Sequence, residues 1–516
     1  MTEAGATAQS PPAIPEARQP LSLARRLLVL LVCVLCTTVF NASMFVASTL
    51  LPQMQGAMSA TQDEISWAIT FNILATAVAT PTTGWLVGRF GRHGVMVFAI
   101  AIFTVATFLC GAATSLQSLV LWRILQGLAG APIIPLSQTI LLDSFDRKHH
   151  GIIIAIYGMT GIIGPTLGPV LGGMLAEATS WRWAFYMLVP FGVVASIGIA
   201  LALPRDLPLG ERRLDWIGFL TFSLAIGCLQ LVLARGERED WFQSNAIILI
   251  ALLAGLAFYL FLAHSLTYDR PFLNLRLLLD RNYALGLCLI AIFGMLNFTP
   301  MVLLPSLLRQ HAGFPDSLIG YIISWRGGGA MTGFFLAMYI SKLDPRIGMG
   351  LGFGLQVTSG LWLASIDLNV SHGVLAANSF IQGLAVGTIW VPMTVATFST
   401  IDNRYLAEAT ALYHLMRNLG SSLFISLSVA EVVRTTGANY SRMTESVTPY
   451  SEALQLPGVS GGWSIETLSG LARLAKEIDR QAAMIGYINA FYLYTAASLA
   501  ALVLVLLVRP PRRRLT

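Results

Sequence analysis

Apolar stretches long enough to cross a bilayer run through most of this 516-residue chain, and they constrain its fold more than any other feature. A membrane-crossing helix needs about 20 mostly apolar residues, and the sequence contains fourteen such stretches. They lie near 27–51, 65–88, 95–113, 118–141, 151–176, 183–204, 215–234, 246–266, 283–305, 317–341, 347–367, 372–399, 409–433 and 483–508. With 55% hydrophobic and 11% charged residues, the composition excludes an ordinary soluble protein. The sequence therefore predicts an all-α membrane protein with 14 transmembrane helices.

Lysines and arginines concentrate on one side of the predicted membrane. With the N-terminus inside, most of the 32 Lys and Arg fall in cytoplasmic segments, and the long segment 434–482 holds several of the others. This distribution follows the positive-inside rule and predicts that both termini are cytoplasmic. The net charge of +6 is then a consequence of topology and does not indicate nucleic-acid binding.

An internal repeat divides the chain. A constant offset places Leu50-Leu51-Pro52 on Leu303-Leu304-Pro305, and a slightly larger one places Gln126–Ala129 on Gln382–Ala385. We expect two parallel six-helix halves, 25–204 and 283–508, separated by an inserted helix pair with its flanking cytoplasmic loops at 205–282. The other expected segments are a disordered cytoplasmic tail at 1–24, a periplasmic loop at 434–482 and a basic cytoplasmic tail at 509–516. Parallel halves are a transporter architecture with the substrate site between them.

Three arginines lie deep inside the apolar stretches: Arg123, Arg326 and Arg417. A charge in hydrocarbon is costly and usually marks a substrate or ion pathway. Alternatively, each arginine bonds backbone carbonyls or polar neighbours such as Gln126 in a buried network. The 26 carboxylates all fall in loops or near the ends of stretches. A cavity lined by these arginines would be net positive and would favour anionic or zwitterionic amphiphiles over lipophilic cations.

His414 is the only histidine clearly inside an apolar stretch. Imidazole titrates near neutral pH and could carry a proton, although a hydrogen-bonded packing residue is the alternative. In the 434–482 segment, Leu468, Leu471 and Leu474 follow a helical spacing. This stretch is expected to be a helix that either lies on the membrane surface or docks a periplasmic partner.

The glycines of the fifth stretch recur at helical spacing. Gly164, Gly168 and Gly172 are four residues apart, so one face of the helix carries no side chains and allows close backbone approach. Pro165, Pro169 and Gly173 accompany them. We expect a close-packed hinge surface, with ordinary helix packing as the alternative.

These motifs resemble those of the major facilitator superfamily, in particular its fourteen-span drug:proton antiporter branch of the EmrB/QacA type. The segment Gly158–Gly173 resembles the antiporter motif, and Trp181–Gly192 resembles the signature that follows it. Arg123-Ile-Leu-Gln126-Gly127 is similar to the motif of span 4, Pro132–Gln138 to the segment that follows it, and Arg417–Gly420 to an element of span 13. The loop between spans 2 and 3 is matched by a stretch containing Gly84, Gly88, Arg89, Gly91 and Arg92, for which the resemblance implies a role at the inner gate.

Two positions depart from the family pattern. Gly88 stands where the loop motif usually carries an aspartate, so the salt bridge made by that acid must be absent or rebuilt. Asn41 stands where span 1 usually carries an aspartate that is a candidate proton carrier. Arg123 is long enough to reach the Asn41 amide. These differences put simple proton coupling in question.

Taken together, the sequence predicts a secondary transporter that exports small amphipathic compounds from a bacterial inner membrane, with substrate or proton coupling at Arg123, Arg326, Arg417, Asn41, Gln126 and His414. The chain has no G-x-x-x-x-G-K-[ST] loop and no convergent metal ligands, so no cofactor, metal or enzymatic activity is expected. The resemblance implies protons as coupling ions, and a periplasmic adaptor protein with an outer-membrane channel as partners. An exporter of one anionic metabolite or siderophore, and a transport-inactive receptor or scaffold, remain alternatives.

Overall fold

The computed structural model describes residues 22–205, 214–268, 271–340, 344–448, 450–451, 456, 463–465 and 467–509. The regular elements in these ranges are helices. The predicted tails at 1–24 and 509–516 lie almost entirely outside them, as does part of the loop before the inserted pair. The fold class predicted from the apolar stretches, all-α, is confirmed for the described chain.

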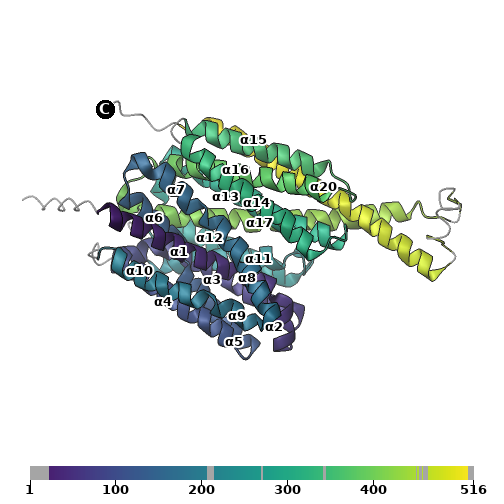
Figure 1. Cartoon of the computed structure of the whole chain (residues 1–516), viewed down its shortest axis with the longest axis horizontal. Coiled ribbons are helices and arrows are strands. Elements are labelled where there is room, and N and C mark those ends of the chain that lie inside the picture. The colour runs from purple at the N-terminus through teal and green to yellow at the C-terminus, as the bar shows by residue number, and fades with distance from the viewer. Residues whose placement is uncertain are drawn as a thin grey trace, which may run out of the picture.

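Two groups of helices pack side by side along the long axis of the molecule (Figure 1). The N-terminal bundle comprises α1 (Leu23–Thr49), α2 (Leu51–Met58), α3 (Gln62–Ala79), α4 (Thr83–Ala112), α5 (Leu116–Gly130), α6 (Ile133–Ser144), α7 (His150–Gly158), α8 (Thr160–Ala178), α9 (Trp181–Tyr186) and α10 (Leu188–Ala202). The C-terminal bundle comprises α13 (Arg281–Gln310), α14 (Asp316–Ile340), α15 (Pro345–Ala364), α16 (His372–Phe398), α17 (Leu406–Thr444) and α20 (Leu468–Leu507). Between them in sequence lie α11 (Trp216–Arg235) and α12 (Asn245–Thr267).

Polar residues before the apolar stretches determine where several helices begin. Thr61 caps α3 with a reciprocal pair of bonds to Glu64, and the Asp280 carboxylate accepts from the Tyr283 amide at the start of α13. Asp344 caps α15 in the same way. Such side chains satisfy amides that have no partner within the first turn, so each apolar stretch starts as a helix at a defined residue.

Eleven helical stretches in the described chain are long and apolar enough to cross a membrane. One of them, Glu64–Ala112, has 49 residues, which is more than twice what a bilayer core needs. It is interrupted at Gly91, whose φ of 75° and ψ of 161° are not helical, and a residue with a side chain would be strained there. The helices α14 and α17 are not among the eleven, because Arg326 with its three following glycines and Arg417 with its polar neighbours lower the mean hydropathy.

The two bundles repeat the same contacts. In the N-terminal bundle α1 packs on α8 and α10, and in the C-terminal bundle α13 packs on α17 and α20. The last carbonyls of α10 and α20 also accept equivalent bonds. Arg25 Nε donates to Ala202 O at 3.0 Å, and Arg281 Nη2 donates to Leu507 O at 3.1 Å. The helix starts that make these bonds therefore lie at one end of the molecule, which also holds both ends of the described chain and is called here the termini end (Figure 1).

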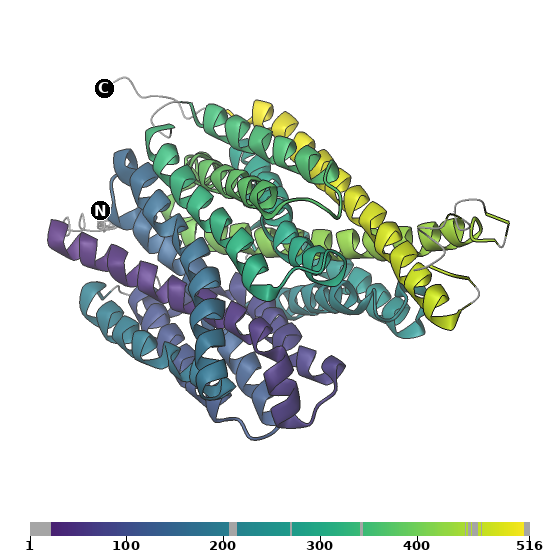
Figure 2. The same ribbon diagram turned by 45° about the vertical axis from the view of Figure 1, so that its right-hand side comes forward.

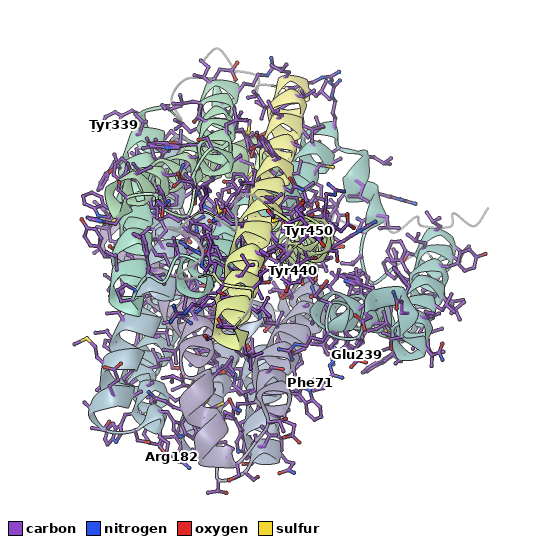
Figure 3. The ribbon with its side chains drawn as sticks, turned by 90° about the vertical axis from the view of Figure 1, so that its right-hand side faces the viewer. Phe71, Arg182, Glu239, Tyr339, Tyr440 and Tyr450 are labelled. Carbon is purple, nitrogen blue, oxygen red and sulfur yellow. The ribbon has the colours of Figure 1, made fainter. Side chains whose placement is uncertain are left out.

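The inserted pair bridges the bundles. Helix α11 packs on α3 of the N-terminal bundle and on α17 of the C-terminal bundle. Gln230 on α11 accepts a bond of 2.8 Å from Ser422 Oγ on α17, and Leu74 on α3 lies against Gly227. Figure 3 shows the pair at one edge of the structure, with Glu239 in the turn that joins the two helices. The pair therefore covers the seam between α3 and α17.

The described parts of 434–482, which the sequence predicts as a loop, are largely helical. Helix α17 has 39 residues and α20 has 40, about 60 Å each at 1.5 Å per residue, and both continue past the bundle at the end opposite the termini (Figures 1 and 2). The helix predicted around Leu468–Leu474 is present, but it is continuous with the membrane-crossing part of α20. It therefore projects from the bundle and does not lie across its end. We call Val433–Thr444 with Leu468–Ala482 the helical extension.

Candidate functional site

A cavity lies between the two bundles. The N-terminal bundle lines it from α1, α6, α7 and α8, and the C-terminal bundle lines it from α13, α14, α16 and α17. Four residues that the sequence singled out are in its wall: Asn41, Pro165, His414 and Arg417. Most of the remaining wall is aromatic or aliphatic, including Phe45, which stacks on Phe298 across the seam at 6.3 Å between ring centroids. Such a lining suits an amphipathic molecule.

Arg417 carries the positive charge of the cavity wall. Its Nε and Nη2 donate to the Asn418 side-chain oxygen at 3.3 and 3.1 Å, and its guanidinium lies 6.0 Å from the centre of the Trp390 ring. The described residues in the wall include no carboxylate. Burying a charge without an opposite charge is costly, so an anion in this cavity would be stabilised by Arg417.

Arg326 lies just behind the wall. Its Nη2 donates to the backbone and side-chain oxygens of Asn297 at 2.6 and 2.9 Å, and Asn297 faces the cavity. The buried Nε of Arg326 has no hydrogen-bond partner among the described residues. Arg326 therefore contributes positive potential to the cavity and orients a cavity-lining amide without itself forming part of the wall.

Arg123 lies in a buried polar network with Gln126, the alternative to a cavity-lining role. It is 1% exposed within the N-terminal bundle, and its Nε and Nη1 donate to Ala68 O at 3.2 Å and Gln126 Oε1 at 2.6 Å. Gln126 in turn donates to the hydroxyls of Ser43 and Thr107 at 2.8 and 2.7 Å. The network is confined to this bundle and neither Arg123 nor Gln126 is part of the cavity wall.

Arg123 is long enough to reach Asn41, but the two side chains share no hydrogen bond in the described chain. The Asn41 amide donates instead to the carbonyl of Thr160 at 3.4 Å, which ties α1 to the start of α8. Asn41 lies in the wall of the same cavity as Arg417. An amide there leaves the charge of Arg417 uncompensated.

His414 joins the bundles at the end of the cavity nearer the termini. Its Nε2 lies 2.5 Å from Gln138 Oε1 on α6, and the side chains of His414 and Gln138 are 2% and 0% exposed. His414 Nδ1, Gln138 Nε2 and Trp390 Nε1 are buried without hydrogen-bond partners in the described chain. Gln138 was not predicted as a site residue from the sequence, although it ends the motif Pro132–Gln138 that carried part of the family resemblance.

Helices α6 and α17 close the space between the bundles on the termini side of His414. Thr139 and Thr410 share a hydrogen bond of 2.7 Å between their hydroxyls, and Asn403 Nδ2 donates to Asp143 Oδ1 at 3.3 Å. We call these two contacts, together with His414–Gln138, the α6–α17 seal. Gly84 adds to this closure, since a Cβ there would lie 3.0 Å from Glu408 Cβ on α17.

Arg92, one of the predicted gate residues, pairs with an acid on α6. Arg92 forms a salt bridge with Asp143, whose other oxygen accepts the bond from Asn403. Asp143 thus connects Arg92 of the N-terminal bundle to Asn403 of the C-terminal one. Arg89 precedes Gly91, where α4 changes direction at the termini end. Of the predicted gate residues, Gly84 and Arg92 contact residues at the α6–α17 seal.

The glycine face of α8 lies directly against α1. A Cβ added at Gly164, Gly168 or Gly172 would lie 2.6 Å from Asn41 Cβ, Ala42 O and Val46 Cγ2, respectively. Gly173 has no atom within 4 Å of such a Cβ and is not part of the contact. The side chain of Pro169 lies outside the described part of the structure. The three spaced glycines are therefore needed for close packing beside the cavity.

The described residues contain no group of three or more His, Cys, Asp or Glu that could hold a metal ion. Arg417, His414 and Trp390 instead offer nitrogen groups to a molecule in the cavity. The chemistry available there is recognition and proton binding.

Comparison with known proteins gives consistent results. The family model for the Major Facilitator Superfamily matches residues 33–425. The multidrug export protein EmrB of Escherichia coli (strain K12) is 30% identical over 509 residues, covering 96% of this chain and 97% of that protein. The fatty acid resistance protein FarB of Neisseria gonorrhoeae is 29% identical over 482 residues, covering 90% and 92%. Among solved structures, the human organic anion transporter MFSD10 superposes with a TM-score of 0.57 at 14% identity, covering 93% of this chain and all of that one.

Proposed function

This chain belongs to the major facilitator superfamily, and from that membership we propose that it exports small amphipathic compounds across a bacterial inner membrane by alternating access. The export relatives EmrB and FarB align over nearly the whole chain. The cavity between the two bundles, closed on the termini side by α6 and α17, is consistent with one state of such a cycle.

We propose fourteen membrane crossings. Dividing Glu64–Ala112 at Gly91 and adding α14 and α17 to the apolar stretches gives this number. The proposed division is into halves at 25–204 and 283–508 with the inserted pair at 205–282, and it is supported by the repeated contacts of α1 and α13. The basic residues at the termini end favour a cytoplasmic position for that end. The α6–α17 seal is then on the cytoplasmic side, and the helical extension is in the periplasm.

The preferred substrate is an anionic or zwitterionic amphiphile. The observation that carries this proposal is Arg417, a guanidinium in an otherwise uncharged cavity wall, with the charge of Arg326 close behind. A charge-assisted bond between guanidinium and a carboxylate, sulfonate or phosphate would offset its burial. The name of the FarB relative, a fatty acid resistance protein, agrees with this substrate class, because a fatty acid is an anionic amphiphile.

Export of purified substrates from proteoliposomes tests this directly. Flux of decanesulfonate should exceed flux of decyltrimethylammonium, since the two share a chain length and differ in the sign of the head group. Replacing Arg417 by Ala removes a charged hydrogen-bond donor worth about 1.5–3 kcal/mol, so the half-saturating concentration for the sulfonate should rise about 10- to 100-fold. Arg417→Lys should lose less. Flux confined to the cation would contradict the proposal.

The number of compounds transported would distinguish a broad exporter from an exporter of one specific compound. The EmrB relatives are named for multidrug export, and an aromatic and aliphatic wall with one charged group suits many acids. Saturable flux of several unrelated acidic amphiphiles would support a broad exporter, whereas flux of one alone would support an exporter of a specific metabolite or siderophore. Absence of any substrate-dependent flux would support a receptor or scaffold.

The helical extension is proposed as the docking surface for a periplasmic adaptor protein, which would lead the substrate to an outer-membrane channel. Arg480 Nε donates to His311 O at 2.7 Å and so fixes α20 to the end of α13. Glu431, Thr435 and Asn489 link α17 to α20 in the same region. These bonds support the two helices as one projecting unit.

A further inference from the structure

The α6–α17 seal contains one titratable group on the cavity side, His414. The contacts along the seal come from Asn403, Thr410 and His414 on the C-terminal side and Asp143, Thr139 and Gln138 on the N-terminal side. Thr410 and His414 are one helical turn apart, and so are Thr139 and Asp143. Asn403 lies in the short 3₁₀ segment Asn403–Tyr405 that leads into α17, so the three contacts form one continuous row along α6. The contact nearest the cavity depends on an imidazole.

His414 has an open position for a proton. With Gln138 Oε1 as acceptor, Nε2 carries the hydrogen of the neutral imidazole, and Nδ1 has no partner within the described chain. The side chain is 2% exposed and lies in the cavity wall. A buried acceptor without a donor is uncommon, and the residue that carries it lines the cavity.

The surroundings of His414 make a second charge costly. The groups that can carry charge near it are Arg417 and Tyr413 on its own helix and Tyr157 on α7. The side chains that face it from α6, α13 and α16 do not titrate: Gln138, Phe293 and Trp390. Arg417 follows His414 by three residues, on the same face of α17. A proton on Nδ1 would therefore place two positive charges together in a wall without a carboxylate.

We propose that His414 is the proton-responsive lock of the cytoplasmic seal: its neutral form holds α6 against α17, and its protonated form favours separation of the two helices. Separation hydrates both charges and exposes the imidazole to the cytoplasm, where the proton leaves. An acidic substrate acts in the opposite sense, because its negative charge neutralises Arg417 and makes the sealed state favourable again. Proton and substrate then shift the equilibrium between the sealed and the open state in opposite directions. Exchange of a proton for a substrate requires this opposition, and His414 can supply it although position 41 is an asparagine. This inference rests on the proposed export function.

Distances across the seal test the proposal. Spin labels at Lys148 and Thr400, exposed residues beside the contact of Arg147 with Ser399 O, would report separation by pulsed electron paramagnetic resonance in liposomes without substrate. The background carries Cys288→Ser because Cys288 is the exposed cysteine of the described chain. Lowering the pH from 8 to 5 should raise the ratio of open to sealed molecules by about fivefold or more, within the usual range for coupled sites.

His414→Gln keeps a neutral donor toward Gln138 and should abolish this pH response. His414→Asn provides a second variant that does not depend on the folding of the first. The matched control is His93→Gln, since His93 bonds Leu203 O at the same end of the molecule but outside the seal, and it should leave the response intact. A pH-dependent opening that persists in both His414 variants, or an unmodified protein that does not open, overturns the proposal.

Flux of decanesulfonate measured on the same samples separates this inference from the proposed function. Opening that depends on His414 without any amphiphile flux supports the lock and contradicts export. Flux with a seal that is indifferent to pH contradicts the lock alone.

Discussion

At the residue scale, two buried arginines with similar depth in the sequence have different surroundings. Arg417 faces a cavity and bonds only the neighbouring Asn418 side chain in the described network, whereas Arg123 is enclosed by Ala68 O, Ser43 O and Gln126. A long apolar stretch reveals depth but not which helix face meets the cavity. For this reason the sequence located both charges and could not assign their roles.

Replacing Arg123 by Ala should reduce stability more than recognition. The change leaves Gln126 Oε1 and the Ala68 carbonyl without their donor, at a cost of about 1–3 kcal/mol for a buried unsatisfied group. We expect a lower thermal midpoint for the detergent-solubilised protein, with little change in the half-saturating concentration of an acidic substrate. Arg417→Ala is the matched variant and should show the reverse pattern. A loss of substrate affinity in Arg123→Ala at unchanged stability would contradict this assignment.

Asn41→Asp should alter the charge preference of the cavity. The new carboxylate would share the cavity wall with Arg417 and offset its charge. We expect weaker flux of decanesulfonate and measurable flux of decyltrimethylammonium, compared in the same proteoliposomes. Asn41→Ser, which introduces no charge, should keep the original preference. If the aspartate variant still prefers the sulfonate to the same degree, Arg417 does not set the sign of the site.

At the element scale, the α1–α8 contact depends on backbone approach. Gly168→Ala places a methyl group 2.6 Å from the carbonyl oxygen of Ala42, and overpacking of this kind typically costs about 1–3 kcal/mol. We expect a lower thermal midpoint and reduced flux. Gly173→Ala on the same helix meets no atom within 4 Å and should behave as the unmodified protein. Equal behaviour of the two variants would show that the contact is not needed.

The helical extension should be needed for resistance of cells to an exported compound but not for flux in liposomes. Replacing residues 440–472 with a short Gly–Ser linker leaves Arg480 and its bond to His311 in place. Flux by the purified protein should be nearly unchanged, while resistance of cells to an exported compound should fall, because the adaptor has lost its docking surface. Unchanged resistance would contradict adaptor docking at this surface, and lost flux would indicate that the extension supports the bundle itself.

At the scale of the whole molecule, hydropathy was sufficient to predict the all-α membrane fold. Of the cavity-wall residues, Arg417 and His414 were indicated by their depth in an apolar stretch, and Asn41 by the family resemblance. Hydropathy does not predict the extension, since the residues after Val433 are polar and indicate a loop, although α17 continues through them to Thr444. It also misses Gln138 and Asn297, because an uncharged amide in an apolar helix gives little signal until its partner is known. The salt bridge between Arg92 and Asp143 could not be predicted either, because it depends on which helices lie together in the fold.

Proton-gradient dissipation in everted vesicles is the most direct test of whether the protein exports acidic amphiphiles through the cavity that Arg417 lines. Decanesulfonate and decyltrimethylammonium would be added separately to vesicles that carry the protein, with Arg417→Ala vesicles as control. We expect the sulfonate to dissipate the gradient, the cation to have little effect, and the response to be lost in Arg417→Ala. Dissipation by the cation alone, or by the sulfonate equally in both proteins, would contradict export of acidic amphiphiles through this cavity.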